Sequence, residues 1–69
     1  MDIKSELTGT VWQVPAQAGQ AVNSGDVLVI LESMKMEIPV EAPRDGTVGR
    51  VHVAAGDSVS AGQVLVTLE

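Results

Sequence analysis

Short apolar runs separated by glycine-containing turns recur along this chain of 69 residues. Apolar and polar residues tend to alternate within the runs, and no long stretch has apolar positions with the roughly 3.6-residue period of a helix. The runs are rich in β-branched residues, which favour strands. The pattern predicts an all-β protein with strands near residues 3–7, 10–15, 20–22, 27–33, 37–42, 47–53, 57–59 and 63–68.

The chain contains an internal repeat. Residues 9–32 align without a gap with residues 46–69, at a shift of 37 positions, and 13 of the 24 aligned pairs are identical. The identical pairs include turn glycines as well as apolar residues. In this register residues 1–32 correspond to residues 38–69, and only residues 33–37 have no counterpart. Two copies are too few for a stacked array, so we expect one small domain with two-fold pseudosymmetry.

Glycines mark the expected turns of both halves. Gly19, Gly25, Gly56 and Gly62 stand among small or polar residues, where a tight turn needs a positive φ angle that glycine adopts easily. A further turn is expected at residues 43–46, which read Pro-Arg-Asp-Gly.

Both halves break strict alternation at the same place. Val11 and Val14 are three residues apart, and their counterparts have the same spacing. A bulge or sharp bend near Trp12 and Gly49 would keep these valines facing the core. We expect the halves to form two small antiparallel sheets packed face to face, as a sandwich or flattened barrel. The hairpin around residues 33–37 would connect them.

Composition limits both the sources of stability and the kinds of partner. One domain, residues 1–69, fits this length, and a chain so short buries only about 60% of its unfolded surface. Without cysteine and with a single histidine, the chain offers no disulfide and no metal site, so an apolar core must stabilise it. The net charge of −5 disfavours contact with a phosphate backbone, so we expect no nucleic-acid partner.

The sequence shows no membrane-spanning segment, no signal peptide and no motif of a hydrolase or metalloenzyme. The longest apolar run, residues 27–31, is too short to span a membrane, and the N-terminus lacks a signal-peptide pattern. We therefore expect a cytoplasmic protein with no membrane contact. No Gly-x-Ser-x-Gly elbow, phosphate loop or histidine pair indicates a hydrolase or metalloenzyme.

Lys35 has 34 residues on either side and lies in the segment that the repeat leaves unexplained. The segment ESMKME, residues 32–37, closely resembles the biotin-attachment hairpin of biotinyl domains, whose usual core is Met-Lys-Met. The segments GDVLVILE, APRDGTV and AGDSVSAGQVLVTLE also match the biotinyl/lipoyl family, so the resemblance covers nearly the whole chain. Ser33 stands where alanine is commonest in that family.

This resemblance implies a fold and a function. The fold is a flattened barrel of two four-stranded antiparallel sheets with quasi-two-fold symmetry and a modified lysine in an exposed turn. Because the halves align without a gap, we expect none of the "thumb" that some bacterial members insert in the first half. The function is that of a non-catalytic biotin carboxyl carrier, which moves carboxylate from a biotin carboxylase to a carboxyltransferase. We expect the isolated domain to be monomeric.

The resemblance also implies roles for the residues of the hairpin. Lys35 would be covalently biotinylated by a biotin protein ligase, through attack of its amine on biotinoyl-AMP. A free lysine amine is almost entirely protonated at neutral pH, so the ligase must promote its deprotonation. Met34 and Met36 are expected to share one face of the hairpin, opposite Lys35, and to be recognised by the ligase. Weaker candidates for recognition flank them: Glu32, Ser33 and Glu37.

Two alternatives remain open. Lipoyl domains have the same fold and carry lipoate on a lysine whose turn typically reads Asp-Lys-Ala. Met34 and Met36 replace both flanking residues here and favour biotin, although some short members of the family are described as biotin/lipoyl attachment proteins. The second alternative is an unmodified interaction module.

Other polar residues are expected to lie in turns or at solvent-exposed strand positions, and not to carry chemistry: Lys4, Asp26, Glu41, Asp45, His52 and Asp57. For Trp12, packing on the barrel exterior and contact with a partner both remain open.

Overall fold

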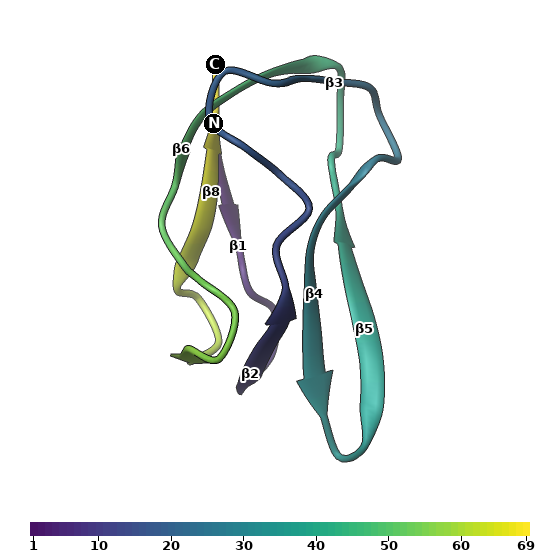
Figure 1. Cartoon of the computed structure of the whole chain (residues 1–69), viewed down its shortest axis with the longest axis vertical. Coiled ribbons are helices and arrows are strands. Elements are labelled where there is room, and N and C mark those ends of the chain that lie inside the picture. The colour runs from purple at the N-terminus through teal and green to yellow at the C-terminus, as the bar shows by residue number, and fades with distance from the viewer.

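The computed structural model describes all 69 residues and contains eight strands and no helix. No helix is therefore long and apolar enough to cross a membrane. All eight expected strands are present (Figure 1). Their bounds are β1 (Asp2–Lys4), β2 (Gly9–Gln13), β3 (Ala21–Val22), β4 (Val27–Ser33), β5 (Met36–Glu41), β6 (Gly46–Val51), β7 (Ser58–Val59) and β8 (Val64–Leu68).

The first strand is shorter than the sequence predicts. The Ser5 hydroxyl donates a hydrogen bond to the Leu7 carbonyl and accepts one from the Leu7 N–H, at 2.5 and 3.3 Å. A serine side chain that bonds the backbone two residues later favours a turn over continued strand. Residues 5–7 accordingly lie outside β1.

The strands form two four-stranded antiparallel sheets, with the orders β1-β8-β6-β3 and β5-β4-β2-β7. The predicted fold class is thus confirmed. Exchanging each strand for its counterpart in the other half, β1 for β5 and so on, converts one order into the other. This confirms the two-fold pseudosymmetry. Each sheet combines strands of both halves, so neither half can complete a sheet alone. The expectation that each half forms its own sheet, with the hairpin connecting the two sheets, is therefore wrong: β4 and β5, on either side of the hairpin, pair within one sheet.

The pseudosymmetry extends to individual hydrogen bonds. Gly19 N–H donates to the carbonyl of Val48 at 2.7 Å, and Gly56 N–H donates to the carbonyl of Val11 at 2.8 Å. Both glycines have positive φ, 88° and 95°. The predicted positive φ is also present at Gly25 and Gly62. The turn glycines therefore join the two halves as well as reversing the chain.

The acids of these turns have the structural roles that the sequence indicated. Asp26 Oδ2 accepts the Asn23 N–H at 2.8 Å, and Asp57 Oδ2 accepts the Ala54 N–H at 2.9 Å. Asp45 accepts the backbone N–H of Ser24 at 2.7 Å and so links two turns that are distant in sequence.

One apolar core fills the space between the sheets. Fourteen buried residues form it, all aliphatic, and the largest fully buried ones are Leu28, Leu31, Leu65 and Leu68, which are two repeat pairs. The strand pairing shifts register between Val11 and Gln13, and again at the equivalent place in β6. These are the bulges that the valine spacing predicted. No buried side-chain polar atom lacks a hydrogen-bond partner.

The β4–β5 hairpin projects from one end of this body, and both chain termini lie at the other end (Figure 1). The molecule measures 30 × 18 × 17 Å along its principal axes. The packed sheets therefore present the residues between β4 and β5 at the extremity of the molecule.

Candidate functional site

Lys35 occupies a two-residue turn at the end of the β4–β5 hairpin. Ser33 and Met36 pair across the ladder, and between them Met34 and Lys35 have φ angles of 53° and 64°. Two successive positive φ angles are the mark of a type I′ turn, whose twist suits a hairpin. Asn-Gly is the usual choice there, because the left-handed region costs other residues about 1–2 kcal/mol each. The turn therefore holds a lysine at its tip at some cost in stability.

This turn corrects one expectation from the sequence. Side chains alternate between faces only while the backbone is extended. Because Met34 and Lys35 are both left-handed, strand alternation does not continue from Met34 to Met36. The prediction that the two methionines share one face opposite Lys35 assumed a strand-like tip, and that assumption is wrong.

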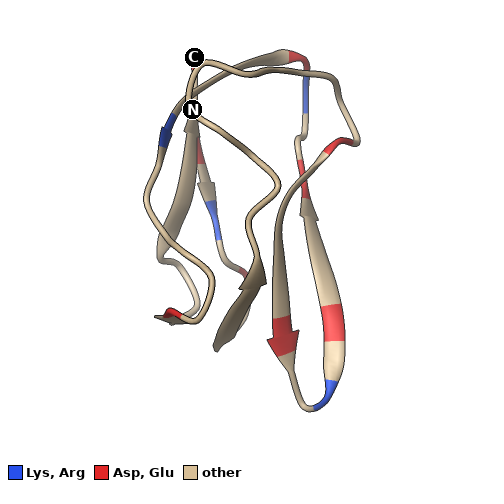
Figure 2. Cartoon of the chain, in the orientation of Figure 1, with Lys and Arg blue, Asp and Glu red and all other residues tan.

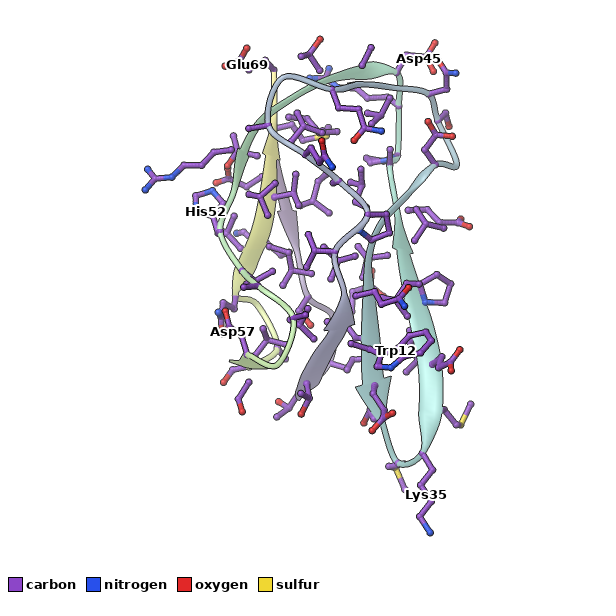
Figure 3. All side chains as sticks on the ribbon, viewed as in Figure 1. Trp12, Lys35, Asp45, His52, Asp57 and Glu69 are labelled. Carbon is purple, nitrogen blue, oxygen red and sulfur yellow. The ribbon has the colours of Figure 1, made fainter.

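The side chains of the tip are open to solvent. Met34 is 91% exposed and Met36 is 63% exposed, so two large apolar side chains stand on either side of the lysine without packing on the body. The Lys35 side chain extends away from both sheets (Figure 3). An amine in this position is accessible to the active site of another protein, and the methionines beside it would be covered by such a contact.

Two acids flank the turn. Glu32 on β4 and Glu37 on β5 are paired directly across the ladder, and both are exposed. Figure 2 shows their negative charge on the two strands just behind the positive tip. The site therefore combines one cation, two exposed thioether side chains and two carboxylates within six consecutive residues.

Contacts at the base of the hairpin fix its position on the body. The half-buried Ser33 donates from its hydroxyl to the Thr8 carbonyl at 3.4 Å. On the neighbouring strand, a Cβ added to Gly9 would lie 2.7 Å from the Glu32 carbonyl oxygen, closer than real Cβ contacts allow. Sequence reasoning missed the role of Gly9. Its identity with Gly46 in the repeat was the available signal, since a Cβ there would lie 3.0 Å from the Glu69 carbonyl oxygen.

The structure groups no other chemistry around Lys35. His52, which follows β6, bonds the half-buried Thr67 of β8 at 2.8 Å, and Thr67 donates to the exposed Asp2 of β1 at 3.1 Å, on the outer side of the other sheet. His52 and Lys4 are exposed, as the sequence predicted. No three His, Cys, Asp or Glu side chains converge in a way that suits a metal ion.

A groove of about 510 Å³ runs between the edge strands β1 and β5. Its lining includes Leu7, Ile38 and Val40 but none of residues 32–37. Small-molecule substrates are usually bound in concave sites. Lys35 instead stands on a projection, an arrangement that suits presentation to another protein.

Comparison with known proteins agrees with this geometry. The family described as "Biotin-requiring enzyme" matches residues 1–68. The biotinylated protein TB7.3 homolog of Mycobacterium leprae is 51% identical over 41 residues, which cover 59% of this chain and 58% of that protein. The aligned segment thus spans less than two thirds of that relative.

Two solved structures share the fold. The urea carboxylase of Kluyveromyces lactis superposes with a TM-score of 0.93 and 35% identity, over 100% of this chain and 6% of that one. The lipoyl domain of the 2-oxoglutarate dehydrogenase complex from Azotobacter vinelandii superposes with a TM-score of 0.78 and 31% identity, over 90% of this chain and 78% of that one. With the family match over residues 1–68, these similarities show that the chain belongs to the biotin/lipoyl domain family of biotin-requiring enzymes.

Proposed function

We propose that residues 1–69 form a biotin carboxyl carrier domain in which Lys35 is covalently biotinylated. The observation that carries this proposal is the exposed lysine at the outer end of the hairpin, between two exposed methionines. A biotinylated relative and the close similarity to a region of a urea carboxylase support it. The site fits the group, because an unhindered primary amine is what amide formation with a carboxylic acid requires.

The attachment step follows from the chemistry of the amine. Lys35 Nζ, once deprotonated, attacks the carbonyl carbon of biotinoyl-AMP; a C–N bond forms, the bond to phosphate oxygen breaks, and AMP leaves. The proton passes to a base of the ligase, because a free lysine amine is almost entirely protonated at neutral pH and must lose a proton before it can attack. The domain contributes position, because a rigid two-sheet body holds the amine at a defined place.

Once attached, biotin supplies a ureido nitrogen that accepts and gives up a carboxylate. The domain itself does no chemistry in this proposal. Its partners are a biotin protein ligase, a biotin carboxylase and a carboxyltransferase, and it acts as a monomeric, cytoplasmic carrier. The projection of the hairpin beyond the body lets each partner take up the end of the Lys35 side chain without contacting most of the two sheets.

The second candidate is a lipoyl carrier, favoured by the similarity to the lipoyl domain of the 2-oxoglutarate dehydrogenase complex. Purified protein would be incubated with ATP and either biotin and a biotin protein ligase, or lipoate and a lipoate ligase. Intact-mass spectrometry should show one biotinyl group added in the first reaction and little change in the second. Efficient lipoylation without biotinylation would reverse the assignment. Lys35→Arg, which keeps the charge but cannot form the amide, is the control.

A further inference from the structure

The outer face of the sheet β5-β4-β2-β7 carries exposed apolar side chains close to the hairpin. Ile30 on β4 pairs with Pro39 on β5 and with Gln13 on β2, and Trp12 lies in the bulge beside Gln13. Trp12 is 43% exposed, Pro39 is exposed and Ile30 is half-buried. Figure 3 draws the Trp12 ring over the β4–β5 hairpin. We call Trp12, Ile30 and Pro39 the Trp12 patch.

The internal repeat provides a control for whether folding requires this patch. At the repeat shift of 37 residues, the equivalent positions in the other sheet are Gly49, Thr67 and Asp2. Thr67 bonds both His52 and Asp2 there, so that outer face is polar. The core leucines and the turn glycines, by contrast, are the same in both halves. The fold therefore needs no apolar residues at these positions, and the Trp12 patch calls for another explanation.

Acidic residues border the patch. Glu37 and Glu41 lie two positions before and after Pro39 on the same face of β5, and Glu32 lies two positions after Ile30 on β4. All three acids are exposed. An apolar centre edged by acids along β4 and β5 is complementary to a protein surface with an apolar contact edged by Lys or Arg side chains. Aromatic residues such as Trp often dominate the binding energy of such contacts.

We propose that the Trp12 patch is the docking surface for the ligase that acylates Lys35, and that the ligase meets it with an apolar surface edged by Lys or Arg. The inference rests on the proposed function and deepens it. Among the partners of a carrier, the ligase acts on the bare lysine, whereas the carboxylase components act at the end of a much longer acylated side chain. The ligase must therefore approach the body of the hairpin most closely, and the Trp12 patch is an exposed apolar surface on that body, in addition to the exposed methionines of the tip.

The test replaces residues of the Trp12 patch with those found at the equivalent positions of the other sheet. Trp12→Gly and Ile30→Thr each introduce the residue that the fold already holds at the equivalent position. Val27→Thr is the matched control, because Val27 is 36% exposed and lies at the opposite end of β4 from the turn. With a purified biotin protein ligase, the KM for the unmodified protein should rise about tenfold or more in both patch variants and stay within about twofold for the control. The kcat should change little, since Lys35 itself is untouched.

Thermal unfolding of each variant checks that the fold is retained. Trp12→Lys provides a second variant that keeps a long side chain in the bulge; its cation should repel the expected Lys or Arg residues of the ligase and also raise KM. A KM within about twofold of the wild-type value in the folded variants would overturn the docking surface while leaving the proposed function intact. Failure of the wild-type protein to be biotinylated at all would overturn both.

Discussion

Glu32 and Glu37 lie directly opposite each other in the β4–β5 ladder, two exposed carboxylates behind the turn that holds Lys35. Like charges at such a pair destabilise a sheet, and the core offers no reason for this one. The pair is better explained by a role in binding a partner protein than by a role in stabilising the fold. It forms the end of the acidic border nearest the lysine.

Removing one of these charges should therefore stabilise the protein. Glu37→Gln is expected to raise the free energy of unfolding by about 0.2–1 kcal/mol at low salt, because it abolishes the repulsion with Glu32. Added salt should shrink this gain, since it screens exposed charges. Urea unfolding of the two proteins at low and high salt measures the effect. A loss of stability in Glu37→Gln would show that the carboxylate makes a favourable interaction.

The left-handed turn makes a separate prediction. Lys35→Gly should raise the free energy of unfolding by about 1 kcal/mol, because glycine adopts the observed φ of 64° without the penalty that lysine bears. Thr47→Gly, at an exposed and extended position of β6, should instead lower it by a similar amount. Both are read from denaturant midpoints at constant m value. Equal effects of the two glycines would contradict the left-handed geometry.

The close approach of β2 to the base of the hairpin can be tested at Gly9. Gly9→Ala should destabilise the protein by about 1–3 kcal/mol, because its Cβ would meet the Glu32 carbonyl oxygen and the strands would have to shift. Gly49→Ala is the control. Its Cβ would meet the flexible side chain of Glu69, which can move away, so the loss should be smaller. Thermal unfolding compares the two, and a milder effect at Gly9 would contradict the packing described.

The methionines should affect modification and not stability. Met34→Leu and Met36→Leu keep an apolar side chain at exposed positions, so the free energy of unfolding should stay within about 0.5 kcal/mol of wild type. If the ligase recognises the thioether side chains, biotinylation by purified ligase should slow several-fold. An unchanged rate for both variants would remove the methionines from recognition.

Much of the fold could be predicted from the sequence because the signals were local or repeated. The valine spacing predicted the bulges, the glycines predicted the positive φ angles of the four turns, and the repeat predicted the pseudosymmetry. The repeat could not show that each sheet takes strands from both halves, because two similar halves allow strand pairing within or between them. The hydrogen bonds of Gly19 and Gly56, each of which joins one half to the other, are seen only in the folded structure.

The sequence singles out Lys35 as a candidate site, but it does not indicate the geometry of the turn that holds this residue. The Met-Lys-Met segment identified Lys35, yet Met and Lys give no signal of positive φ, so the type I′ turn was missed. The role of Gly9 depends on a carbonyl more than 20 residues away in sequence. For Trp12 the sequence leaves both packing on the barrel exterior and contact with a partner open. The structure places it on the outer face, on the same sheet as the hairpin.

Covalent attachment of biotin to Lys35 is the proposal on which the function of the domain depends. The most direct test is intact-mass spectrometry of the protein purified from its native host, followed by fragmentation to locate any added group. We expect a species heavier by one biotinyl group, with the added mass on Lys35 and none on Lys4. An unmodified Lys35, or a lipoyl group in its place, would contradict it.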